Sequence, residues 1–436
     1  MADNTDPESV AFGTAVLRKV TLRLIPFLFL LYVVNLIDRI NIGIARLQMV
    51  DGEHAFLSEK AYALGAGLFY IGYLLFEVPS NLILLRVGAR VWIARIGVTW
   101  GLISASMMFA KDAETFQFLR ILLGFAEAGF FPGIIYYLSQ WFPARARAKA
   151  VATFMTGGVM ATMIGNPLSG MILQHMDQVG GLWGWQWVFL LEGIPAVLMG
   201  FATLAYLTDR PDQAHWLTEA ERTWLIDELA REKQADAGHH RHTLRAAFTE
   251  PRIWLLIAIY FTVAVGDNVY GFYTPSFLKS QFADWSPGQI GFLAGVPSVF
   301  ALVAMYLVGR HSDQTGERRW HVAGCAFTAS IGWLVIALAP SPWIFVVGLT
   351  IALVGMKSML PTFWTLPTTF LSGTAAAGGV ALINSVANLG GFFGPRIIGH
   401  VKTSDGNFDA GFFIMCGIML LGGLMTLFVR TGSKTE

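Results

Sequence analysis

The stretch Asn35-Leu36-Ile37-Asp38-Arg39-Ile40-Asn41 places an acid beside a base inside a run that otherwise has the composition of a membrane-spanning helix. An ionised side chain at the centre of a bilayer costs about 2.5 to 3.5 kcal/mol on insertion scales. Hydrophobic burial gives no reason for such a pair. Asp38 and Arg39 are therefore candidate functional residues, and the rest of the chain must supply their partners.

The composition around this stretch is that of a polytopic membrane protein. The 436 residues are 55% hydrophobic and 14% charged, with a mean hydropathy of +0.55 and a net charge of +1. We predict an all-α fold of twelve transmembrane helices, because runs long enough to cross about 30 Å of hydrocarbon recur along the chain. These runs fall at 20–44, 61–84, 91–110, 114–140, 147–174, 185–207, 252–279, 288–310, 321–339, 342–369, 375–401 and 409–429.

The distribution of positive charge predicts the topology. With the N-terminus inside, 21 Lys and Arg residues fall on the cytoplasmic side and five on the opposite side. Both termini are therefore expected in the cytoplasm, as tails 1–19 and 431–436, and no cleavage site precedes the first span. The long polar connection 208–251 contains Thr218-Glu219-Ala220-Glu221, a capping-box pattern that predicts an amphipathic helix along the cytoplasmic face.

An internal repeat divides the chain into two six-helix halves, 20–207 and 252–430. Three pairs of residues in different loops and helices are each 228 positions apart: Gly88 and Gly316, Arg90 and Arg318, and Pro167 and Pro395. A constant offset of this kind indicates two related halves in parallel orientation, joined by the segment 208–251. Under the same offset, Asp38 maps within one residue of Asp267.

The two loops related by the repeat are candidate cytoplasmic gating loops. The first carries Gly88 and Arg90, and the second carries Asp313, Gly316 and Arg318. Glycine permits a tight turn between helices, and we expect Asp and Arg to pair across the halves. A phosphate-binding loop is the alternative, but no strand precedes either loop and the P-loop pattern is absent.

Depth arithmetic brings a second pair of charges to the level of the first. At a rise of about 1.5 Å per residue, Arg120 lies at a depth similar to that of Asp38 and Arg39. Arg120 and Glu127 are seven residues apart, so they share one helical face, which can line a cavity. Two acids and two bases on neighbouring helices are expected to neutralise one another. A static network that locks the helices together is the alternative.

Opposing effects on these acids suggest proton coupling. Desolvation raises the pKa of a carboxyl group, whereas an adjacent arginine lowers it. An acid that is subject to both effects can bind a proton when its arginine leaves it to bind a substrate anion. We therefore interpret Asp38 and Glu127 as proton-coupling residues, and Arg39 and Arg120 as substrate-binding residues.

The second half contributes further candidates for the substrate site: Tyr270, Tyr273, Lys357, Trp364 and Asn384. For any one aromatic residue, ordinary packing is the alternative. Nearby prolines at 275, 361 and 367 suggest interrupted helices, whose free backbone groups must face protein or a wet cavity. Lys357 is either a cation for the substrate or a partner of Asp267, and the sequence leaves both open.

Several other polar residues favour structural roles. Glu77 is expected to form a latch near Arg86 and the basic loop at 145–149, and Glu192 follows an interfacial aromatic group. The histidines at 239, 240 and 242 fit a solvated loop better than a metal site, and Cys325 and Cys416 have no ligand spacing. No cofactor other than the coupling proton and no nucleic-acid partner is expected.

The chain resembles the major facilitator superfamily, and within it the anion:cation symporters of the tartrate and phthalate type. The resemblance covers essentially the whole chain and is carried by residues 38–43, 77–81, 120–127 and 189–195. It implies proton-coupled import by alternating access, with Asp38 and Glu127 similar to the titrating acids. Tyr70 or Tyr73, Trp364 and Asn384 look like substrate-contacting positions. The first-half loop departs from the family pattern, with Asn81 and Leu85 at the usual Gly and Asp places.

These observations together predict a transporter in the bacterial inner membrane. It would import a small organic anion, a carboxylate such as tartrate, phthalate or a sugar acid, by proton symport, as a monomer in the lipid bilayer. A drug or cation exporter of the same fold is the main alternative, although its acids should lack matching bases. A membrane-embedded enzyme should carry a nucleophile or metal motif such as HExxH, and a channel should lack paired halves.

Overall fold

The computed structural model describes residues 7–52, 55–237, 250–367, 373–402 and 408–429, and its main elements are α-helices. Short 3₁₀ turns lie at Met107–Phe109, Val179–Gly181 and Pro211–Gln213. The helices are α1 Pro7–Ile40, α2 Ile42–Met49, α3 Glu59–Val87, α4 Ala89–Ser106, α5 Ala113–Glu127, α6 Phe130–Trp141, α7 Ala144–Met155, α8 Gly157–His175, α9 Gly184–Tyr206, α10 Glu219–Ala237, α12 Pro251–Gln281, α13 Pro287–Thr315, α14 Arg319–Ala337, α15 Pro342–Phe363, α16 Gly373–Ala387, α17 Gly390–Val401 and α18 Asp409–Thr426.

Ten segments of the described residues are long and apolar enough to cross a membrane. Two of them, Val10–Met49 and Ala113–Trp141, each contain two consecutive helices. The remaining predicted spans, 147–174 and 375–401, fall on the helix pairs α7/α8 and α16/α17. The all-helical polytopic fold is therefore as predicted. One boundary differs, because α1 begins at Pro7, inside the segment predicted as the N-terminal tail.

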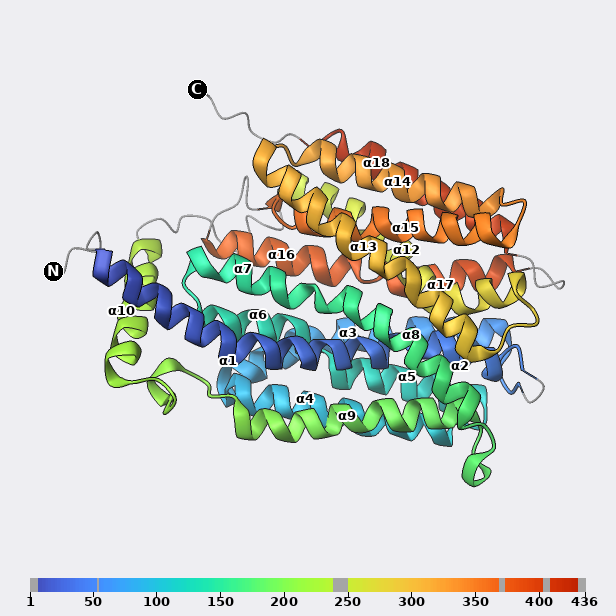
Figure 1. The fold of residues 1–436 in the computed structure, drawn as a ribbon, viewed down its shortest axis with the longest axis horizontal. Helices are drawn as coiled ribbons and strands as arrows, with labels where there is room; N and C mark the ends of the chain where they lie inside the picture. The colour runs from blue at the N-terminus through green and yellow to red at the C-terminus, as the bar shows by residue number, and fades with distance from the viewer. Residues whose placement is uncertain (1–6, 53–54, 238–249, 368–372, 403–407, 430–436) are drawn as a thin grey trace.

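The helices form two groups that lie side by side in Figure 1. The N-terminal group, α1–α9, occupies the lower part of the view, and the C-terminal group, α12–α18, occupies the upper part. Within the groups, α4 packs along α9 and α14 packs along α15. Between the groups, α8 packs on α13 and α3 packs on α17. The boundaries 20–207 and 252–430 of the two halves stay a prediction.

The internal repeat has a direct structural counterpart in α3 and α13. Both helices contain 29 residues, and α13 begins 228 positions after α3. Each ends at a glycine with positive φ, +100° at Gly88 and +69° at Gly316, a conformation that residues with a Cβ rarely adopt. The same turn chemistry therefore ends the second helix of each group.

Helix breaks occur at positions that the prolines did not predict. Helix α12 continues through Pro275 and α15 continues through Pro361, so the expected interruptions at these residues are wrong. The breaks lie instead between α1 and α2 at Asn41, between α5 and α6 at 128–129, between α7 and α8 at Thr156, and between α16 and α17 at 388–389. The first two breaks directly follow the charged residues Asp38, Arg39 and Glu127.

Helix α10 lies in the long connection and packs against the start of α1. Its N-terminus forms the expected reciprocal bonds, in which Thr218 N donates to Glu221 Oε2 at 2.8 Å and Glu221 N donates to Thr218 Oγ1 at 3.3 Å. Leu225 is buried, and Lys19 of α1 pairs with Glu221 at 2.7 Å. In Figure 1 α10 lies with the beginning of α1 and with α7, at the opposite end of the bundle from α2 and α17.

Candidate functional site

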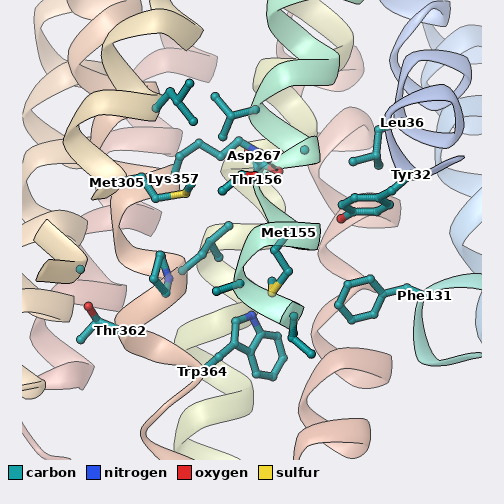
Figure 2. A pocket seen from close by; sticks show the side chains of 18 of the residues that line it. Tyr32, Leu36, Phe131, Met155, Thr156, Asp267, Met305, Lys357, Thr362 and Trp364 are labelled. Atoms are coloured by element: carbon teal, nitrogen blue, oxygen red, sulfur yellow. Dashed lines mark hydrogen bonds and ion pairs between the residues drawn. The ribbon is translucent and has the colours of Figure 1, made fainter. Parts of the chain in front are cut away.

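A cavity of about 1530 Å³ lies between the two helix groups. Its walls come from α1, α3, α7 and α8 on one side and from α12, α13, α15 and α16 on the other. The lining reaches Arg147 near the start of α7 and Arg310 near the end of α13, so the cavity extends toward that end of the bundle. Figure 2 shows Tyr32 and Leu36 of α1 opposite Asp267 and Lys357. A site between two groups of helices is a common place for a small ligand.

Arg39 brings positive charge to the cavity wall, and Glu127 neutralises it. The guanidinium donates through Nη2 to Glu127 Oε1, and the two side chains are 21% and 1% exposed. Arg39 also lies over the rings of Phe69 and Tyr73, at 5.0 and 5.5 Å from their centroids. The predicted charge cluster contains two cations, Arg39 and Arg120. Of these two, Arg39 lines the cavity and Arg120 does not. Arg39 is the group that a ligand can reach.

Arg120 lies behind this pair rather than in the cavity. Its side chain is fully buried, and its three guanidinium nitrogens have no hydrogen-bond partner among the described residues. Its guanidinium lies 5.0 Å from the centroid of the Phe69 ring. Gly124, which shares the helical face of Arg120 and Glu127, packs against the backbone of Phe69 in α3. The expectation that this face of α5 lines the cavity is therefore wrong, because the glycine lets α5 approach α3 closely.

Asp38 is also buried away from the cavity, and it is not paired with an arginine. The Ser104 hydroxyl of α4 donates to its Oδ1, and Asn41 Nδ2 donates to the same oxygen at 3.5 Å. Its Oδ2 has no hydrogen-bond partner among the described residues. The predicted mutual neutralisation of four charges thus holds for Arg39 and Glu127 only. The break of the helix at Asn41 places a side-chain amide beside the acid.

A second ion pair faces the same cavity from the C-terminal group. Lys357 Nζ of α15 lies 2.7 Å from Asp267 Oδ1 and 3.0 Å from Oδ2 on α12. The side chains are 16% and 35% exposed, and both line the cavity (Figure 2). The sequence left Lys357 as a substrate cation or a partner of Asp267, and the structure shows that it pairs with Asp267 while remaining on the cavity wall.

Most of the predicted uncharged site residues also line the cavity. They are Tyr70, Tyr73, Tyr270, Trp364 and Asn384. The Tyr70 hydroxyl donates to Asn268 Oδ1, which joins α3 to α12 beside both ion pairs. The Trp364 ring packs edge-on against Tyr260 at 4.9 Å, and its Nε1 has no hydrogen-bond partner among the described residues. These groups supply aromatic surface and hydrogen-bond donors on the cavity wall.

Tyr273 does not belong to the cavity, contrary to the prediction. It is fully buried closer to the C-terminal end of α12, where its ring lies 5.1 Å from the Arg46 guanidinium. Residues 270 and 273 lie within about 60° of each other around α12, but Tyr273 is nearly one turn, about 4.5 Å, further along the helix. One turn is enough to take Tyr273 below the cavity floor.

The region around Tyr273 contains an ion-pair network that the sequence did not reveal, and we call it the sealed end. The fully buried Arg46 donates to Asp51 at 2.5 Å, to Glu59 and to the hydroxyl of Ser276. Lys402 completes the network at 3.3 Å from Asp51 and 3.0 Å from Glu59. Arg46 and Lys402 are two of the five Lys and Arg residues that the charge distribution assigns to the non-cytoplasmic side. Their equal sign and the 356 positions between them gave no signal for a shared site.

Glu77 links the two helix groups instead of meeting the basic loop. Its carboxylate accepts from Ser385 Oγ at 2.6 Å and from Asn384 Nδ2 at 3.5 Å, both on α16. The expected contact with Arg86 and the loop at 145–149 is wrong. In that loop, Arg145 and Arg147 pair with Glu228 and Glu232 of α10, at 3.0 and 2.8 Å.

The two candidate gating loops form their contacts within their own helix groups. The backbone N of Arg90 donates to Asp209 at 2.8 Å, and Gly88 leaves room for that carboxylate. In the other loop Arg318 pairs with Asp313 at 2.7 Å, around the turn at Gly316. The predicted pairing of Asp and Arg across the halves is therefore wrong in this structure. Asp313 and Arg318 of the second loop line the cavity.

Comparison with known proteins identifies the family. A profile of the Major Facilitator Superfamily matches residues 28–395 and 282–436. The chain belongs to this superfamily. The resemblance noted in the sequence is confirmed, and the protein is a transporter rather than an enzyme. The solved structure of a bacterial homolog to the human lysosomal transporter Spinster shares the fold, with a TM-score of 0.75 at 16% identity over 94% of this chain and 97% of that one.

Three relatives of known name cover nearly the whole chain. A protein of Agrobacterium vitis named "Putative tartrate transporter" is 47% identical, over 96% of this chain and 92% of that one. The "Quinolone resistance transporter" of Acinetobacter baumannii is 42% identical, over 96% and 95%. The "Inner membrane transport protein RhmT" of Escherichia coli is 40% identical, over 97% of both chains. The major facilitator protein described here is thus a multi-pass membrane transporter.

Proposed function

We propose that this protein carries a small organic anion, with tartrate as the first candidate, into the cell together with protons. The observation that carries the proposal is the Arg39 guanidinium on the cavity wall, held by the buried carboxylate of Glu127. Arginine binds carboxylates through two parallel hydrogen bonds, so a substrate carboxylate can compete with Glu127 for it. The name of the relative at 47% identity supplies the candidate substrate.

Competition for one arginine couples the anion to a proton. When a substrate carboxylate takes Arg39, Glu127 loses its counter-charge in a site from which water is excluded. A bare carboxylate there is costly, and uptake of a proton removes that cost. Asp38, whose Oδ2 has no partner among the described residues, is the second proton-coupling acid. Arg120 adds an unpaired positive charge behind Phe69, which attracts the anion to this wall.

Alternating exposure follows from the two ends of the cavity. We place both termini, α10 and the basic loops in the cytoplasm, so the cavity is open inward and the sealed end faces outward. Rocking of the halves 20–207 and 252–430 would open the sealed end and close the other, with the gating loops at Gly88 and Gly316 brought together. The unit that does this is a monomer in the inner membrane, and each monomer has its own cavity.

Proteoliposomes separate binding from proton coupling in this scheme. With Glu127→Gln we expect tartrate counterflow exchange to continue, because Arg39 remains available, while accumulation driven by a proton gradient is lost. With Arg39→Gln both activities are lost. Glu219→Gln, on exposed α10, is the matched control for removal of an acid and retains both. Proton-driven accumulation by Glu127→Gln at the native level would show that the coupling assignment is wrong.

Drug export is the second candidate, because one relative at 42% identity is named for quinolone resistance. Against it, two acids at the cavity are neutralised by basic partners, in the pairs Arg39–Glu127 and Lys357–Asp267. Transport assays in the same proteoliposomes distinguish drug export from anion symport. Quinolone transport without any tartrate counterflow would favour the exporter, whereas tartrate counterflow that a quinolone does not inhibit would favour the symporter.

A further inference from the structure

The cavity contains a second cation that carboxylate binding to Arg39 does not use. Lys357 stands on the α15 wall, within 2.7 Å of the Asp267 carboxylate on α12. Both side chains are only partly buried and line the cavity, so solvent and ligand can reach them. Figure 2 shows the lysine directed toward Asp267 on the cavity wall, and Thr156 of the other helix group lines the same cavity.

The second ion pair occupies the place in the C-terminal group that the first occupies in the N-terminal group. Arg39 and Asp267 are 228 positions apart, the offset that also separates α3 from α13. Each is the member of its pair that lies on the first long helix of its group. The repeat therefore places one ion pair on each side of the cavity, with the signs of the charges exchanged.

The two pairs are close enough to act on one small ligand. Tyr70 of α3 donates its hydroxyl to Asn268, the neighbour of Asp267 on α12. Tyr70 and Tyr32 line the same cavity as Arg39 and Asp267. A molecule held by Arg39 beside these tyrosines thus has the Lys357–Asp267 pair in front of it.

We propose that Lys357 binds a second carboxylate of the transported anion, so that the carrier prefers dicarboxylates to monocarboxylates. This inference rests on the proposed function, in which Arg39 binds the first carboxylate. Each substrate carboxylate displaces one internal carboxylate, Glu127 from Arg39 and Asp267 from Lys357. The dianion then bridges the two helix groups, and an anion with one carboxylate cannot do so.

The two cations differ in what they select. The planar guanidinium of Arg39 orients one carboxylate through two donors in a fixed geometry. Lys357 is a point charge on a flexible four-carbon stem, so it can follow the second carboxylate over a range of positions. The Lys357 end of the site should therefore tolerate changes in the length and hydroxylation of the acid more readily than the Arg39 end does.

The test compares two anions that differ by one charge. L-Tartrate and its monoamide have nearly the same shape, but the monoamide has a single carboxylate. We expect the native protein in proteoliposomes to prefer tartrate in kcat/KM for counterflow by about tenfold or more, because a hydrogen bond to a charged group contributes about 1.5 to 3 kcal/mol. The preference should collapse in Lys357→Gln and persist in Lys357→Arg, which keeps the cation.

Lys111→Gln is the matched control, since Lys111 is exposed in the connection before α5 and should leave the native preference unchanged. Equal transport of both anions by the native protein, or an undiminished preference in Lys357→Gln, would overturn the inference while leaving the proposed function standing. Transport of neither anion would overturn the proposed function as well. If Lys357→Gln fails to fold, the two anions on the native protein and on Lys357→Arg still decide the question.

Discussion

Charged side chains serve the cavity and the sealed end in different ways. In the cavity each ion pair stays within one helix group. Arg39 of α1 pairs with Glu127 of α5, and Lys357 of α15 pairs with Asp267 of α12. None of these contacts holds the two groups together. The groups can therefore separate on this side without breaking an ion pair.

At the sealed end the charged contacts cross between the groups. Arg46 of α2 binds Asp51 and Glu59 of its own group and also the hydroxyl of Ser276 on α12. Lys402, directly after α17, contacts both of those acids from the other group. Opening this end therefore exposes or breaks several charged contacts at once. The difference indicates that the sealed end holds the conformation, and that the cavity pairs are free to respond to the substrate.

The largest expected effect comes from removing the centre of the crossing network. Arg46→Gln leaves the carboxylates of Asp51 and Glu59 with Lys402 as their remaining cation, and breaking a buried ion pair costs about 3 to 5 kcal/mol. We expect the equilibrium to shift toward the state in which the sealed end is open. Spin labels at positions 60 and 280, both exposed and on opposite groups, would report a longer distance by pulsed electron resonance.

The matched comparison for this measurement is Lys402→Gln, in a background where Cys325 and Cys416 are replaced by alanine. Lys402 is partly exposed and its loss leaves Arg46 in place, so we expect a smaller shift, on the order of 1 kcal/mol. Lys111→Gln should give the native distance distribution. Native distances in Arg46→Gln would mean that the ring contact between Tyr62 of α3 and Tyr273 of α12, rather than the charges, closes this end.

The next largest effect is a difference in stability between variants of the two cavity ion pairs, because their acids are buried to different extents. Glu127 is 1% exposed and lies near both Arg39 and the fully buried Arg120, whereas Asp267 is 35% exposed and, among the described residues, pairs with Lys357 alone. Glu127→Ala removes the ion-pair partner of Arg39 and one of the carboxylates near the buried Arg120, and we expect a cost of about 3 kcal/mol or more. Asp267→Ala should cost about 1 kcal/mol or less. Thermal unfolding of the purified proteins in one detergent measures both.

Equal losses of thermal stability in the two variants would remove the distinction. It would mean that water reaches Glu127 as freely as it reaches Asp267. The two ion pairs of the cavity would then contribute equally to stability, as they occupy equivalent positions in the two helix groups. An exchange of acid for amide, Glu127→Gln, should fall between the alanine variant and the native protein, because the amide oxygen can still accept from Arg39.

The sequence predicted which residues are unusual better than it predicted what they touch. Hydropathy marked the apolar helical segments, and the 228-residue offset agrees with the equal lengths that the structure shows for α3 and α13. Charge at membrane depth also marked Arg39 and Glu127, which do pair. Such signals are local or periodic, so they can be recognised in the sequence without knowledge of the fold.

Contacts that depend on the direction of a side chain could not be predicted in the same way. The face of α5 with Arg120 turns toward α3 because Gly124 allows the backbones to meet, and Tyr273 lies one turn beyond the cavity. Arg46 had no signal at all, since its acids lie in the following loop and at the start of α3, and Lys402 lies far along the chain. The helix breaks at Asn41 and Gly129 likewise depend on packing rather than on proline.

The smallest effect is expected for an ion pair at the surface. Its contribution to stability can be compared with those of the ion pairs in the cavity and at the sealed end. Lys19 of α1 bonds Glu221 of α10 at 2.7 Å, and together with the Thr218 backbone it holds the pKa of Glu221 below its ordinary value. A carboxyl whose pKa is lowered by folding contributes stability above the pKa of the unfolded chain, and the contribution is lost as the pH falls through the folded value.

Lys19→Ala should therefore weaken the docking of α10 at neutral pH by about 0.2 to 1 kcal/mol, the range for solvent-exposed pairs, and by less in acid or high salt. Amide hydrogen exchange over residues 219–237, corrected for intrinsic rates, measures the change. Arg18→Ala removes an equal charge from the neighbouring exposed position and is the control. A loss as large as that for Arg46→Gln would show that α10 is part of the machinery that opens and closes the cavity, and that burial alone does not rank these ion pairs.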